Sequence, residues 1–216
     1  MVGDMNRPTT PAEAWAELAA GNERFVSGRM LHPSQGVEHR TELSTGQAPF
    51  AVVFGCSDSR VAAEIIFDRG LGDAFVVRTA GHVIDTTVLG SIEYGVEILD
   101  APLVVVLGHD HCGAVTAATR ALVDGETPHG FVRTVVDRVI PSIVALTASG
   151  RPVASLDVEE LAHEHLRATA HMLTDYSATL ARRVAEGTCA VVAVGYTLAE
   201  GTVSVAEVIG DISPAG

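Results

Sequence analysis

The chain has 216 residues, of which 14 are Lys or Arg and 27 are Asp or Glu, so its formal net charge is −13. A hydrophobic share of 47% against 19% charged residues indicates a globular chain with a real core and excludes disorder for most of it. The acidic balance, without any run of Lys or Arg, argues against nucleic acid or a membrane as a partner. Residues 1–6 are polar and do not resemble a secretory signal, so the predicted location is cytoplasmic.

The first predicted element is a helix that begins at Pro11. The sequence Thr-Pro-Ala-Glu at 10–13 is typical of a capping box with proline at the first helical position. Residues 30–47 have no clear period and are expected to form a long connection. We therefore predict a helical arm with its connection over 1–46, whose apolar stripe packs on a neighbouring chain, and an α/β domain over 47–216.

Three short apolar runs follow, at 50–55, 74–77 and 103–107. They are rich in Val or Phe and do not alternate with polar residues, which is typical of parallel strands buried on both faces. Residues 86–99 carry apolar side chains at helical spacing, and residues 112–123 also look helical. These two segments complete an alternation of strands and helices. This order predicts an α/β fold with a mostly parallel central sheet flanked by helices.

The C-terminal part is predicted to add helices and an edge strand. Residues 131–146 have helical spacing, with a kink or break expected at Pro141. Residues 156–186 look like one long helical stretch. The β-rich runs 188–196 and 202–208 are separated by a short turn and predict a hairpin, which would place an antiparallel strand at one edge of the sheet.

Nearly all chemically reactive side chains follow two of the predicted strands. Residues 55–60 read Gly-Cys-Ser-Asp-Ser-Arg, and residues 108–113 read Gly-His-Asp-His-Cys-Gly. Since ligands bind at the carboxyl edge of an open parallel sheet, we expect Cys56, His109 and Cys112 to converge there. Two thiols and an imidazole suit tetrahedral zinc, and three protein ligands with an open fourth position are the pattern of catalytic sites.

Other interpretations apply to single residues of this set. Cys56 alone would be read as an ordinary buried cysteine, but the charged residues beside both strand ends are hard to explain by packing. Cys189 has no polar neighbours of this kind and is expected in the core. A group of polar residues in the long helical stretch is expected to be a solvated face rather than a metal site; it comprises His163, Glu164, His165 and His171.

Together, the two motifs resemble those of the plant-like β-class carbonic anhydrases, over essentially the whole chain. The resemblance implies that Cys56, His109 and Cys112 bind Zn²⁺. It also implies that Asp58 and Arg60 form a catalytic pair beside the metal. The substrate-binding residues it implies are Gln47, Phe75, Tyr94 and Gly113.

The implied function is reversible hydration of CO₂ to bicarbonate and a proton, by attack of zinc-bound hydroxide, in a homodimer or tetramer. Two alternatives stay open at this point: a hydrolase of CS₂ or COS on the same scaffold, and a non-catalytic zinc-binding protein with Asp58 as permanent fourth ligand. Asp58 is also an alternative fourth ligand in an inactive state of the enzyme. His82, His111 and buffer all remain candidates for carrying the proton.

Overall fold

A computed structural model describes residues 7–147 and 150–213 of the chain. Residues 1–6, on which the expectation of a non-secreted chain rests, lie outside the described residues. One five-stranded sheet is present, with the order β2-β1-β3-β4-β5. Its strands are β1 (Ala51–Cys56), β2 (Ala74–Thr79), β3 (Leu103–His109), β4 (Ala190–Tyr196) and β5 (Val203–Ile209).

The helices lie between and around these strands. The α-helices are α1 (Pro11–Val26), α2 (Val37–Glu42), α3 (Ala63–Ile66), α4 (Thr86–Glu93), α5 (Gly113–Val123), α6 (Val132–Thr147), α7 (Val158–Tyr176) and α8 (Ala178–Ala185). Short 3₁₀ helices are η1 (Leu43–Thr45), η2 (Ala80–His82) and η4 (Val153–Ser155), and a π-helical turn, η3 (Tyr94–Ile98), continues α4. None of the helices in the described ranges is long and apolar enough to cross a membrane.

The sheet confirms the predicted fold class. β1 pairs in parallel with both β2 and β3, β3 pairs in parallel with β4, and β5 runs antiparallel to β4 at the edge. β1 and β3 are buried along their whole length, as predicted. β2 is only half-buried, so the prediction of burial on both faces is wrong for residues 74–77. The reason is that β2 lies at the other edge and has one neighbouring strand.

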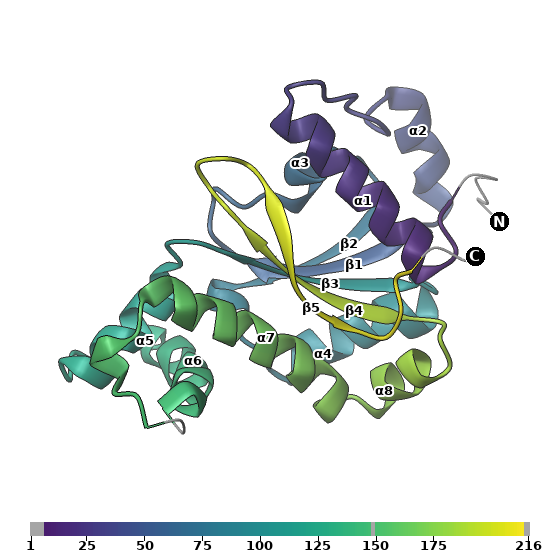
Figure 1. Cartoon of the computed structure of the whole chain (residues 1–216). Helices are drawn as coiled ribbons and strands as arrows, with labels where there is room; N and C mark the ends of the chain where they lie inside the picture. Colours follow the sequence, from purple (N-terminus) through teal and green to yellow (C-terminus); the bar gives the residue numbers. More distant parts are fainter. Residues whose placement is uncertain (1–6, 148–149, 214–216) are drawn as a thin grey trace.

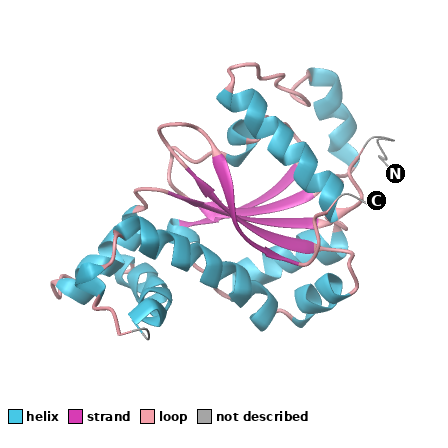
Figure 2. Ribbon diagram, in the orientation of Figure 1, coloured by secondary structure: helices cyan, strands magenta, loops and turns pink. Residues whose placement is uncertain are grey.

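Helices cover both faces of the sheet and create a three-layer molecule (Figures 1 and 2). α1 and α3 lie on one face, where Leu18 and Phe67 pack against residues of β1, β3 and β4 such as Val105. α4, α7 and α8 lie on the other face, where Ile92 and Leu173 join the second half of the core. α5 and α6 pack beside α7 and form a third apolar cluster, which extends to the carboxyl ends of β1 and β3.

Helix α1 begins as predicted. The Thr10 hydroxyl accepts the Glu13 N–H and the Glu13 carboxylate accepts the Thr10 N–H, which is the reciprocal bonding of a capping box. Ala14 and Leu18 are fully buried against the sheet of the same chain. Leu18, which belongs to the predicted apolar stripe, is therefore covered by the sheet of its own chain, and the packing of the arm on a neighbouring chain stays a prediction.

Three further details differ from the sequence predictions. The connection over 30–47 contains α2 and η1, which bury no residue and so leave no apolar period to detect. The stretch over 156–186 is two helices, because Ser177 is extended and its hydroxyl caps α8 by accepting the Leu180 N–H. Pro141 does not break α6; its neighbours Val139 and Ile143 are fully buried, and their packing offsets the lost hydrogen bond.

Candidate metal centre

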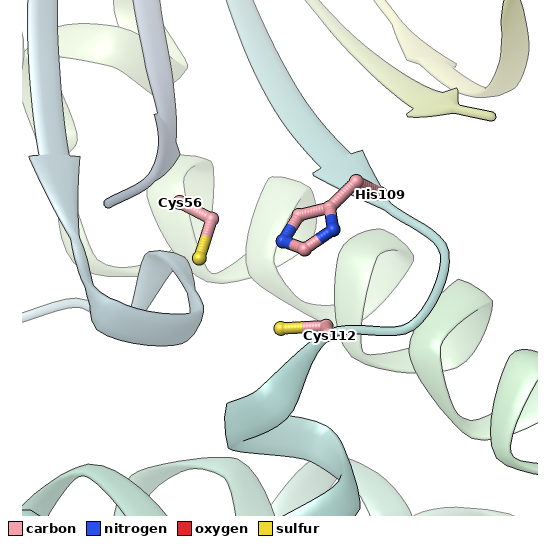
Figure 3. Close-up of side chains that lie close together, drawn as sticks. All are labelled: Cys56, His109 and Cys112. Carbon is pink, nitrogen blue, oxygen red and sulfur yellow. The ribbon is translucent and has the colours of Figure 1, made fainter. Parts of the chain in front are cut away.

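Three sequence-predicted ligands meet at the carboxyl edge of the sheet. Cys56 is the last residue of β1, His109 is the last residue of β3, and Cys112 precedes the first turn of α5. β1 and β3 are paired neighbours, which brings their ends together although they are 53 residues apart in sequence. The two sulfur atoms and a ring nitrogen of His109 all lie within 4.8 Å of one another. Figure 3 shows the three side chains pointing toward a common centre.

The hydrogen bonding of His109 fits a metal ligand. Its Nδ1 lies 2.7 Å from the Asp110 carbonyl, which only accepts, so Nδ1 carries the ring hydrogen. Its Nε2 is buried and has no hydrogen-bond partner within the described part of the chain. A buried nitrogen lone pair without a donor is costly unless something else binds it. Because it faces two thiols, the donor set fits a zinc ion with bonds of about 2.0–2.3 Å.

Both cysteine thiols have strongly altered acidity. The neighbouring Cys112 side chain lowers the pKa of Cys56, and the Gly81 N–H, which donates to Cys56 Sγ at 3.3 Å, adds to this effect. The proximity of Cys56, together with burial, raises the pKa of Cys112. Cys56 is therefore the thiol of the pair that ionises first. A cation at this centre would favour the ionised form of both thiols, which is the form that metals bind.

Asp58 and Arg60 form a bidentate pair beside the ligands. Arg60 Nε lies 2.9 Å from Asp58 Oδ1 and Arg60 Nη2 lies 2.7 Å from Oδ2, and the Arg60 backbone N–H also reaches Oδ1. These hydrogen bonds hold the pKa of Asp58 well below its usual range. Asp58 Oδ2 lies 3.9 Å from His109 Nε2, so an ionised carboxylate borders the centre as an acceptor that cannot donate.

The backbone around Cys56 is fixed by residues that the sequence analysis did not single out. Arg78, at the end of β2, donates to the carbonyls of Cys56 and Asp58 at 2.9 and 2.6 Å. Gly81, in η2, donates its N–H to Cys56 Sγ at 3.3 Å. Only the position of Arg78 at a predicted strand end could have indicated its role. The Gly81 contact is made by the backbone and leaves no side-chain signal.

The four residues predicted to bind substrate do not all lie near these ligands. Gly113 follows Cys112 directly and begins α5 at the centre. Phe75 pairs with Val52, four residues before Cys56, which at about 3.3 Å per strand residue places it about 13 Å away along the sheet. Tyr94 lies with Phe75, their ring centroids 6.0 Å apart, and is half-exposed. Gln47 is exposed and precedes β1, at the opposite end from Cys56.

The two histidines named as proton carriers occupy opposite environments. His82 is 2% exposed, and neither of its ring nitrogens has a hydrogen-bond partner among the described residues. Burial holds the pKa of His82 well below its usual range, so its ring is neutral. The His111 side chain is largely exposed, and its Nδ1 lies 3.6 Å from Glu159 Oε1. Of the two, His111 is the one in contact with solvent.

Two other sequence interpretations have clear outcomes. Cys189 is buried in the core, which confirms the prediction, and burial raises the pKa of its thiol to about 12. The predicted solvated face of α7 is correct for His163 and His171, which are exposed. It is wrong for His165, which is 1% exposed and hydrogen-bonded in the interior. His165 lies on the buried side of α7 with Leu161, and its ring contacts Ser142, Gly81 and His82.

Comparison with known proteins gives one consistent family. The family model described as "Carbonic anhydrase" matches residues 51–203. "Carbonic anhydrase 2" of Mycobacterium tuberculosis and "Carbonic anhydrase" of Mycolicibacterium smegmatis are each 54% identical over 94% of this chain and 97% of their own length. Among solved structures, a tetrameric β-carbonic anhydrase of Sordaria macrospora is similar in fold, with a TM-score of 0.67 and 26% sequence identity. The match covers 77% of this chain and 84% of the Sordaria macrospora chain.

Proposed function

The chain belongs to the β-class carbonic anhydrases, enzymes that hydrate CO₂ reversibly to bicarbonate, and we propose that Cys56, His109 and Cys112 hold the zinc ion of this reaction. The observation that carries the proposal is that the buried Nε2 of His109 has no hydrogen-bond partner among the described residues, while the three ligand atoms lie within 4.8 Å of one another. When bound, zinc lowers the pKa of a coordinated water to near neutrality and so supplies the nucleophile. Three protein ligands leave the fourth position open for it.

Asp58 and Arg60 orient the reactants in this proposal. Arg60 engages both carboxylate oxygens of Asp58 and keeps the group ionised. The remaining lone pairs of Asp58 would accept a hydrogen bond from the attacking group and so orient it toward the carbon of the substrate. The same hold by Arg60 keeps Asp58 from turning onto the metal as a fourth ligand. The Gly113 N–H, the first amide of α5, would donate to a substrate oxygen, since the first amides of a helix have no partner within it.

The remaining substrate contacts come from a second copy of the chain. Gln47, Phe75 and Tyr94 lie too far along the sheet to reach the ligands of their own chain, yet Gln47 and Tyr94 are accessible on the surface beside the edge strand β2. The related Sordaria macrospora enzyme is described as tetrameric. A homodimer or tetramer in which this surface faces a partner's metal centre supplies apolar rings for CO₂ and an amide for bicarbonate. We further propose that the enzyme acts in the cytoplasm.

The zinc assignment is tested by metal analysis together with stopped-flow CO₂ hydration. Cys56→Ser and Cys112→Ser should each lose zinc and activity together, because an alcohol is a much weaker zinc ligand than a thiolate. Cys189→Ser is the matched control: it changes a third buried thiol outside the centre and should keep both zinc and activity. Full zinc content in either of the first two variants would show that the ligands are misassigned.

A further inference from the structure

We propose that His165 is a positioning residue for the zinc ligand Cys56, and that it acts through the backbone of Gly81. His165 lies on α7 and does not touch the metal ligands. Its Nε2 is 2.9 Å from the Gly81 carbonyl oxygen, and the Gly81 N–H donates to Cys56 Sγ at 3.3 Å. Gly81 is therefore held on one side by an imidazole and bonded on the other side to a ligand sulfur. The inference rests on the proposed zinc site.

The direction of each hydrogen bond in this chain of groups follows from the chemistry of its members. The Gly81 carbonyl can only accept, so His165 Nε2 carries the hydrogen. Burial lowers the pKa of His165, so the ring is neutral and its Nδ1 is an acceptor. Ser142 Oγ lies 3.0 Å from that Nδ1 and must donate to it. Ser142 thus fixes the tautomer that His165 needs in order to hold Gly81.

The surroundings of Gly81 leave it little other freedom. Its φ of +65° is a conformation that favours glycine, and an added Cβ would lie 2.5 Å from the Cβ of Ala114 on α5. The next residue, His82, stacks on His165 with ring centroids 4.5 Å apart and an interplanar angle of 28°. Phe54 meets the His82 ring edge-on from β1. The His165 ring is therefore held in plane by packing as well as by its two hydrogen bonds.

This arrangement has a consequence for the metal. An N–H donated to a ligand thiolate withdraws negative charge from the sulfur and fixes its direction, so the sulfur donates less charge to the zinc. A site with two thiolates needs such withdrawal if the zinc is to remain a strong Lewis acid. Loss of the His165 hydrogen bond frees Gly81 to move and weakens its bond to Cys56 Sγ. The sulfur should then donate more charge to the zinc, but the loss of its fixed direction should outweigh this gain and weaken the hold on the metal.

The test compares His165→Gln with His165→Asn in protein loaded with cobalt(II) or zinc. Glutamine places an amide nitrogen near the position of Nε2 and can still donate to Gly81, whereas asparagine is too short to reach it. Two readouts apply: the energy of the sulfur-to-cobalt charge-transfer band, and the rate of zinc release to a chelator. His171→Gln is the matched control, an exposed histidine on the same helix.

We expect His165→Asn to shift the charge-transfer band and to release zinc about 10-fold faster, within the range found for outer partners of metal ligands. His165→Gln should keep the band energy and the release rate close to the wild-type values, and His171→Gln should resemble the wild type. A folded His165→Asn with an unchanged band and release rate overturns the inference. If it does not fold, Ser142→Ala takes its place, and an unchanged band and rate there overturn it equally. Wild-type protein that binds neither metal overturns the proposed zinc site itself.

Discussion

Arg60 is the residue on which the orientation of Asp58 depends. Replacing it with Gln removes the bidentate pair and leaves the carboxylate free to turn, so we expect CO₂ hydration to fall by about 10- to 100-fold at unchanged zinc content. Arg60→Lys should recover only part of the loss, because an ammonium cannot engage both oxygens in the same plane. Stopped-flow kinetics on zinc-loaded protein gives the result.

Arg24 provides the control for that substitution. Its Nε lies 2.7 Å from Asp68 Oδ2, in an ion pair with one side-chain hydrogen bond that includes none of the proposed metal ligands. Arg24→Gln should leave the turnover of folded, zinc-loaded enzyme unchanged. An equal loss of turnover in Arg60→Gln and Arg24→Gln would mean that Arg60 supports the fold and has no part in the reaction.

The sequence could predict that the proposed metal ligands meet, because simple rules connect their positions to the fold. Cys56 and His109 end neighbouring parallel strands, and parallel strands bring their carboxyl ends to one edge. His165 shows where such reasoning stops. It falls four residues after the buried Leu161, but its polar neighbours concealed that spacing. Its partner Gly81 is contacted through a carbonyl, and no pattern of side chains records a backbone contact.

At the scale of elements, α1 is joined to the sheet by one buried amide. Asn22 donates to the carbonyls of Ile66 and Gly201 and accepts the N–H of Val203. Asn22→Leu keeps the approximate size but leaves these three backbone groups unpaired in the interior. We expect it to lower the free energy of unfolding by about 3 kcal/mol, since each buried unpaired group costs about 1–3 kcal/mol and partial access of water reduces the sum.

Urea denaturation at fixed protein concentration measures this loss, because the stability of an oligomer depends on concentration. Glu23→Gln is the control, an exposed neighbour on the same helix, and should change stability little. A loss below about 1 kcal/mol for Asn22→Leu would show that water pairs the three groups in its place.

Elements were predictable where they bury an apolar stripe or carry a cap. α1 has both, and its first residue was placed correctly from the capping box. α2 has neither, because none of its residues is buried and no side chain caps its first turn. The sequence therefore contains no signal from which α2 could be predicted. The break at Ser177 was missed because the serine also donates to Glu93, 84 residues earlier, and a distant partner is not visible in local spacing.

At the scale of the whole molecule, the residues proposed to form one site are divided between two ends of the sheet. The family resemblance implied Gln47 and Tyr94 as substrate contacts, and the motifs predicted Cys56, His109 and Cys112 as ligands. Neither indicated that the substrate contacts and the ligands of one chain lie far apart. The single-chain fold explains this separation, because it fixes the distance along β1 and β2. In the proposed homodimer, closed symmetry would bring the two ends together, since a two-fold axis repeats each contribution in both sites.

A shared site predicts that two defective chains can complement each other. Gln47→Ala alone should lower activity by about 100-fold, as the loss of one donor to the developing charge typically does. Cys56→Ser alone should be inactive. In a mixed dimer the metal centre of the Gln47→Ala chain receives Gln47 from the Cys56→Ser chain and is complete, so one site in two works and about half of the wild-type activity returns.

Co-expression with two different tags, purification of the mixed species and stopped-flow CO₂ hydration measure this recovery. The control pairs Cys56→Ser with Cys112→Ser. Both substitutions damage the same three-ligand cluster, so no mixed dimer has a complete centre, whether sites are shared or not. Recovery in the first pair but not in the second identifies a site built by two chains. The mixed dimer of Gln47→Ala and Cys56→Ser could instead be no more active than the average of its parents. That result would mean that Gln47 serves its own chain, and the fold would then have to bring Gln47 about 16 Å along β1 to reach the metal.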